Sequence, residues 1–154
     1  MIAKTLKTLG FFLLLCLQLA AGDSILGAWT LERHFTQNGE NHREREELQL
    51  SPGSFRMRLT VDITKGPVEI KGLAIDATGL WKLQDRTLVL ILGEIRFAGV
   101  ASTRGIDRGS FRTLVRQLRE RYLSDPIRIF TLLSEDGRTL TLKSPEGVRE
   151  YRRP

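Results

Sequence analysis

The stretch SFRMRLTVDI, residues 54–63, alternates apolar and polar side chains along its whole length. The apolar side chains occupy every second position and are those of Phe55, Met57, Leu59, Val61 and Ile63. A period of two residues is typical of a β-strand with one buried face and one solvated face. The sequence therefore predicts a strand here, with its apolar face in a core.

Similar short runs recur on both sides of this stretch, and turn signals separate them. The runs are residues 68–75, 80–83, 87–93, 127–133, 139–142 and 148–151. The turn signals, each with glycine or proline, are residues 52–53, 65–67, 76–79, 136–137 and 146–147. Short strands separated by turns are typical of a sandwich or an up-and-down barrel. We predict a mainly β fold, a single antiparallel up-and-down β-barrel of about eight to ten strands with no domain boundary within residues 23–154.

One segment has a helical period instead. Its apolar residues share one helical face and are Phe111, Leu114, Val115, Leu118 and Tyr122. Ser110 is a candidate N-cap, and Pro126 follows the expected end. We therefore predict one amphipathic helix over residues 110–123, before the final hairpins. The preceding residues, 101–110, are small or rich in glycine and predict a mobile loop.

Arginines flank the apolar stripe of this helix, at Arg112, Arg116 and Arg119. In one interpretation they form the solvated rim of a helix packed across the barrel mouth. In the other, they form a basic surface that meets an anionic membrane or an acidic protein partner. The sequence leaves both interpretations open.

Residues 1–22 are typical of a secretory signal peptide. Lys4 and Lys7 precede an apolar run, and small residues follow at positions 20–22. The run is well short of the roughly 20 residues that span a bilayer. We expect cleavage near residue 22, a mature domain of residues 23–154, and a periplasmic or secreted location. The one cysteine, Cys16, would leave with the signal, so cysteine catalysis and cysteine-ligated metal sites are excluded for the mature chain.

The charge balance is mildly basic. The whole chain has 24 basic and 18 acidic residues, and loss of Lys4 and Lys7 leaves 22 basic residues and a net charge of +4. Such an excess suits an anionic surface or ligand. It lacks the clustered basic stripes that nucleic-acid-binding proteins usually carry, so we expect no nucleic-acid partner.

The sequence offers little for catalysis. His34 and His42 lie near several glutamates, but their spacing matches no compact ligand set, and residues 38–47 predict a charged turn. There is no Gly-x-Ser-x-Gly motif and no phosphate-binding loop. We predict that the protein is not an enzyme and uses no metal and no cofactor.

Three segments resemble the lipocalin-like (calycin) family of small β-barrels, in particular bacterial secreted lipocalin-like domains. They are ILGAWTLE (25–32), GLWKLQDRTLVL (79–90) and SEDGRTLTLKSPEGVREYRRP (134–154). The resemblance covers nearly all of the chain after residue 22. The chain departs from the family pattern in two ways, because the helix precedes the final hairpins and the usual disulfide pair is missing.

The resemblance implies structural roles at the closed end of the barrel. Trp29 would plug this end, and Arg152 or Arg153 would cover its indole. Gly27 would let the backbone pass close to the ring. A guanidinium over an indole is worth roughly 0.5–2 kcal/mol, depending on burial.

Two functions fit these features. The first is a secreted or periplasmic lipocalin-like protein that binds a small hydrophobic ligand inside the barrel. Its candidate lining residues are Phe55, Met57, Leu59, Ile70, Trp81, Leu90 and Phe130. The same residues could instead simply fill the core, and an apolar cavity of about 300 Å³ or more would favour ligand binding. The alternative is a non-enzymatic envelope interaction module, an inhibitor or adaptor that acts through its loops and basic helix.

Overall fold

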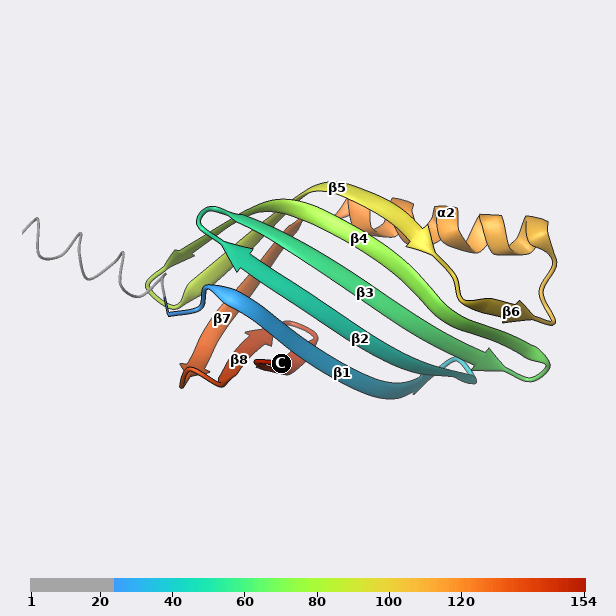
Figure 1. The fold of residues 1–154 in the computed structure, drawn as a ribbon, viewed down its shortest axis with the longest axis horizontal. Helices are drawn as coiled ribbons and strands as arrows, with labels where there is room; N and C mark the ends of the chain where they lie inside the picture. The colour runs from blue at the N-terminus through green and yellow to red at the C-terminus, as the bar shows by residue number, and fades with distance from the viewer. Residues whose placement is uncertain (1–23) are drawn as a thin grey trace, which may run out of the picture.

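Five long strands joined by tight turns make up the first part of the fold (Figure 1). The structure is a computed structural model that describes residues 24–154. The five strands are β1 (Gly27–Gln37), β2 (Glu40–Ser51), β3 (Ser54–Lys65), β4 (Val68–Gln84) and β5 (Thr87–Gly99). Each strand pairs antiparallel with the next, because the connections are too short for anything but hairpins.

The remaining elements close the barrel. They are β6 (Ser102–Arg104), α2 (Arg108–Ser124), β7 (Ile127–Glu135), β8 (Thr139–Ser144) and β9 (Gly147–Arg152). The sheet order is β3-β2-β1-β9-β8-β7-β5-β4-β6, and the additional pairing of β3 with β4 closes eight of the strands into a ring. Strand β6 is an extra strand on β4. The predicted fold class is therefore confirmed: an antiparallel barrel with one helix before the final strands.

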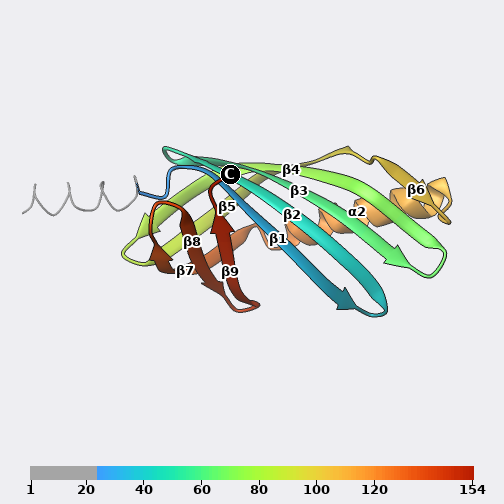
Figure 2. The same cartoon turned by 60° about the horizontal axis from the view of Figure 1, so that its bottom comes forward.

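The inward faces of the strands form two apolar clusters. The first fills the barrel and includes Trp29, Phe55, Leu90, Phe130 and Tyr151. The second lies where the long strands extend beyond the ring, and it consists of Leu59, Val61, Ile63, Ile70 and Leu73. Helix α2 covers this second cluster with its apolar face. Figures 1 and 2 show the helix running along the far halves of the long strands.

The turn predicted at residues 76–79 is wrong, because β4 continues through it. Asp76 is held on the outer face by a bidentate ion pair with Arg58 of β3. Gly79 serves close packing instead of a turn, since a Cβ there would lie 1.9 Å from the carbonyl oxygen of Ile91 and 2.8 Å from the Phe55 ring. The pairing of β4 with β5 shifts register between Thr78 and Gly79. The polar and glycine residues at 76–79 therefore mark a β-bulge and not a turn.

Four other local predictions also need correction. The charged turn predicted at residues 38–47 is confined to Asn38 and Gly39, and the rest belongs to β2. The loop predicted at residues 101–110 contains β6, whose three residues pair with β4. The helix begins at Arg108 instead of residue 110, and its N-cap is Asp107 instead of Ser110. Short polar segments carry weak local signals, so pairing with a neighbouring strand decides their structure.

The predicted signal peptide, including Cys16, lies outside the described residues and stays a prediction. Within residues 24–154, no helix is long and apolar enough to cross a membrane. In the same range, no group of three or more histidine, cysteine, aspartate or glutamate side chains is placed to hold a metal ion.

Candidate functional site

The predicted ligand-lining residues face the interior but fall into different clusters. Phe55, Met57, Leu90 and Phe130 belong to the first cluster, and Trp81 packs against it. Leu59 and Ile70 belong to the second cluster, under helix α2. The structure therefore does not bring these seven residues together around one space. Their role as ligand-binding residues stays a prediction.

Trp29, near the start of β1, is enclosed by contacts with distant parts of the chain. Its side chain is fully buried, and its Nε1 donates a hydrogen bond to the carbonyl oxygen of Ile25 at 2.7 Å. The Arg153 guanidinium lies 4.2 Å from the centroid of the indole ring. Arg152 instead pairs with Glu150 at 3.1 Å, and its backbone is paired with Thr30 of β1. The arginine that covers the indole is thus Arg153.

A polar network that the sequence interpretation missed crosses the barrel interior. Glu46 of β2 and Arg149 and Tyr151 of β9 are all buried. The Tyr151 hydroxyl donates to Oε1 of Glu46 at 2.6 Å, and an Arg149 nitrogen donates to Oε2 at 3.3 Å. Burial raises the pKa of Tyr151, and the negative charge of Glu46 raises it further. The sequence does contain a signal for the burial of Glu46. In a strand, Glu46 lies on the same face as the apolar residues Leu48 and Leu50, two and four positions further on.

These buried contacts are structural in character. The network leaves both carboxylate oxygens of Glu46 paired, which a buried charge requires. Near it, Arg128 lies 4.7 Å from the centroid of the Tyr122 ring. Burial also raises the pKa of Tyr122. The network therefore ties β2 to β9, and the contact of Arg128 with Tyr122 ties β7 to the end of α2.

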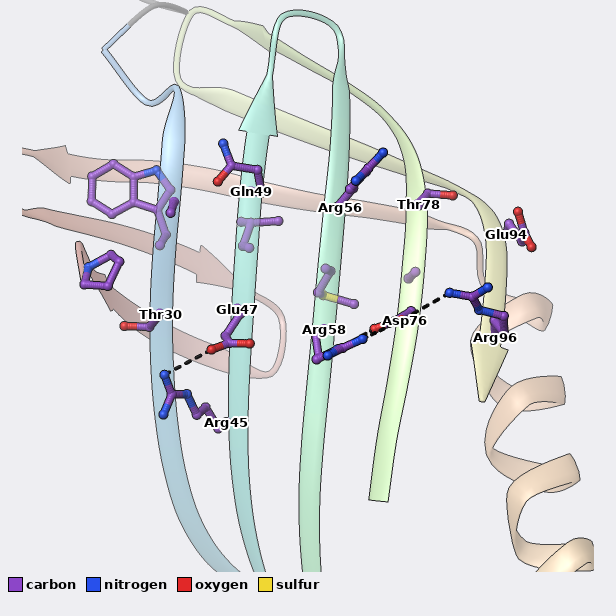
Figure 3. A pocket seen from close by; sticks show the side chains of 16 residues that line it. Thr30, Arg45, Glu47, Gln49, Arg56, Arg58, Asp76, Thr78, Glu94 and Arg96 are labelled. Carbon is purple, nitrogen blue, oxygen red and sulfur yellow. Dashed lines mark hydrogen bonds and ion pairs between the residues drawn. The ribbon is translucent and has the colours of Figure 1, made fainter. Parts of the chain in front are cut away.

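A groove of about 610 Å³ lies on the outer face of strands β1 to β5 (Figure 3). Its rim carries charged side chains that pair with one another. Arg58 contacts the two oxygens of Asp76 at 2.7 and 2.9 Å, and Arg96 approaches the same carboxylate at 3.5 Å. Arg45 pairs with Glu47 at 3.0 Å. The hydrogen bonds from Arg58 lower the pKa of Asp76.

This groove has the charged, solvent-exposed side chains of an ordinary outer sheet face. Its floor is formed by residues such as Leu48, Met57 and Ala77, whose buried side chains alternate with the charged ones. It therefore lies outside the barrel and offers a ligand mostly paired, exposed charges, which contribute little to binding.

Helix α2 carries the most distinctive charge pattern of the described residues. Arg112, Arg116 and Arg119 are four and three positions apart, a spacing that places them on one face. All three side chains are exposed, and none forms an ion pair or hydrogen bond within residues 24–154. Arg108 and Arg121 are also exposed, against one acidic residue in the helix, Glu120.

The apolar stripe, which the arginines flank, fixes the orientation of the helix. Phe111 makes an edge contact with Phe97 of β5 at 6.2 Å between ring centroids, and Leu114, Val115 and Leu118 pack on the second cluster. The apolar stripe thus packs against the rest of the molecule and is not available to a partner. The arginine face, which we define as Arg112, Arg116 and Arg119, lies beside this stripe, is exposed, and is the candidate functional site.

Comparison with known proteins supports the class of fold alone. The chain is similar to the crystal structure of an uncharacterized protein from Bacteroides eggerthii DSM 20697, with a TM-score of 0.50 and 16% sequence identity. The similarity covers 84% of this chain and 98% of the other. No family model and no curated protein matches the sequence. The protein is thus a small closed antiparallel β-barrel, a class that hosts many functions.

Proposed function

We propose that this protein is an exported, lipocalin-like barrel without enzymatic activity that binds a negatively charged partner through the arginine face of helix α2. The observation that carries the proposal is that Arg112, Arg116 and Arg119 are exposed together and unpaired within the described residues. The planar guanidinium of arginine suits phosphate and carboxylate groups, which it contacts with two parallel hydrogen bonds. The eight-stranded ring and the Arg153–Trp29 contact support the lipocalin-like character of the scaffold.

The packed interior favours this function over ligand binding inside the barrel. Phe55 is 2% exposed and Leu90 5%, and both lie within one continuous apolar cluster. An eight-stranded barrel is just wide enough for side chains to fill its interior. The groove of about 610 Å³ lies on the outer face instead. We therefore place the function on the surface of the molecule.

Long-chain inorganic polyphosphate is a suitable probe, because it offers closely spaced anions and no apolar part. We expect the wild-type protein to bind it at low ionic strength and to release it as salt is added, since exposed charges are screened. The triple variant R112Q/R116Q/R119Q should bind roughly 3- to 150-fold more weakly, since exposed ion pairs are worth about 0.2–1 kcal/mol each. Isothermal titration calorimetry measures both effects.

The matched control is R43Q/R56Q/R138Q, which removes the same charge from exposed positions elsewhere. Its affinity for polyphosphate should stay close to that of the wild type. Equal losses in the two triple variants would show that only net charge matters. The arginine face would then not be a binding site, and the proposed function would be wrong.

A further inference from the structure

The arginine face continues into an exposed leucine. Leu123 follows Arg119 by four positions, so it extends the same helical face, and it is 42% exposed. The end of this face thus changes from positive charge to apolar surface. The following inference rests on the proposed function, because it starts from the arginine face.

Beyond Leu123, exposed apolar side chains run across the outer face of three strands. Ile127 opens β7 and pairs with Ile91 of β5, which in turn pairs with Leu80 of β4. These three side chains are 51%, 45% and 61% exposed, respectively. Ile129, two positions beyond Ile127 on the same face, is 58% exposed. We call Leu80, Ile91, Ile127 and Ile129 the apolar row.

The apolar row and the arginine face are held next to each other. The carbonyl oxygen of Pro126, between the helix and β7, accepts a hydrogen bond from the backbone N–H of Leu92 at 2.8 Å. This bond fixes the end of the helix beside β5, one residue from Ile91. Arg119 also borders a small crevice with Ile95 and Phe97 of β5. The arginine face therefore lies on the β5 side of the helix, and the row continues from its end.

We propose that the arginine face and the apolar row together form a docking surface for an anionic phospholipid membrane. The guanidinium groups contact lipid phosphates, and the row enters the boundary between headgroups and acyl chains. Charge alone gives weak, reversible attachment, and stable membrane attachment usually needs a second signal. The row supplies that signal. A soluble polyanion or an acidic protein surface would satisfy the arginines and leave the apolar side chains in water.

The first test measures the contribution of the apolar row to membrane binding separately from that of the arginine face. Vesicle flotation compares phosphatidylcholine alone with phosphatidylcholine mixed with phosphatidylglycerol. We expect the wild type to float with the mixed vesicles. The variant I91T/I127T should bind them roughly tenfold more weakly or worse, since two large apolar side chains no longer leave water. Its affinity for polyphosphate should be unchanged. Threonine keeps the β-branched shape, so the strands remain favoured.

The control L133T/V148T changes two exposed apolar side chains outside the row and should float as the wild type does. A second measurement reports insertion directly. In I127W, fluorescence should be quenched by lipids brominated on their acyl chains, whereas V148W should show only the background of the two native tryptophans. Circular dichroism and thermal unfolding check that each variant folds.

The outcomes distinguish this inference from the proposed function. If I91T/I127T floats like the wild type and only R112Q/R116Q/R119Q fails, the arginine face binds anions but the row does not insert, and the inference is wrong. If both triple-arginine variants bind polyphosphate equally, the proposed function also fails. If I91T/I127T changes only self-association in sedimentation velocity, the row joins two copies of the chain, and membrane docking is overturned.

Discussion

At the scale of single residues, Gly27 and Arg153 share one small space beside Trp29. Gly27 has a φ of +110°, which side chains rarely tolerate. A Cβ at this position would lie 2.5 Å from a guanidinium nitrogen of Arg153. Glycine is therefore required at this position for two reasons: its backbone conformation, and the space that the Arg153 guanidinium occupies over the indole.

Gly27→Ala should lower the free energy of unfolding by about 1–3 kcal/mol, from backbone strain and displacement of Arg153. In an Arg153→Ala background the same substitution should cost less, because only the strain remains. Urea unfolding of the four proteins in this double-mutant cycle measures the difference. Equal costs in the two backgrounds would show that Arg153 does not press against residue 27.

At the scale of elements, the start of helix α2 is set by its N-cap residue, Asp107, which precedes the apolar stripe. Asp107 accepts a hydrogen bond from the backbone N–H of Ser110 at 2.9 Å and another from the Ser110 hydroxyl at 2.6 Å. The hydrogen bond from this hydroxyl is the main cause of the lowered pKa of Asp107. The cap orients the first turn and thereby places the arginine face.

Asp107→Ala should lower the thermal midpoint and the helical signal in circular dichroism, whereas Asp107→Asn should retain most of both, because asparagine also caps. The folded pKa of Asp107 is depressed. Its stabilisation is therefore present above the unfolded value of about 3.9 and is lost as pH falls through the folded pKa. This acid-dependent loss should be absent in Asp107→Asn. Indistinguishable midpoints for Asp107→Ala and the wild type would contradict the capping role.

At the scale of the whole molecule, a filled barrel and a ligand-binding barrel predict different behaviour for the same side chains. A core residue stabilises the fold by its burial, whereas a residue facing an empty cavity makes fewer contacts. Phe55 tests the difference, because it is 2% exposed and would contact any Cβ added at Gly79.

Phe55→Ala should lower the free energy of unfolding by about 3–5 kcal/mol if the interior is packed. Native mass spectrometry of the wild-type protein, purified from its own host, should then show the mass of the bare chain. An additional mass of a small apolar molecule in the wild type, absent from Phe55→Ala, would instead support ligand binding inside the barrel.

Local sequence patterns were sufficient to predict the class of the fold and the inward face of most strands. Alternation between Phe55 and Ile63 requires one buried face, and the helical period from Phe111 to Tyr122 requires a helix with one buried side. These patterns are local, so they survive without knowledge of the neighbours. The sequence also singled out Arg112, Arg116 and Arg119 but left open which way they face.

Which segments meet depends on the tertiary structure. It turned the predicted turn at residues 76–79 into continuous strand, because Arg58 and Phe55 lie opposite on β3. It also buried Glu46 against Tyr151, 105 positions away in the chain. The orientation of α2 and the position of Ile127 beside Ile91 likewise depend on contacts between distant segments. The hydrophobic period of a strand or helix indicates which of its sides is buried. Which strands pair depends on how the whole sheet closes into the barrel.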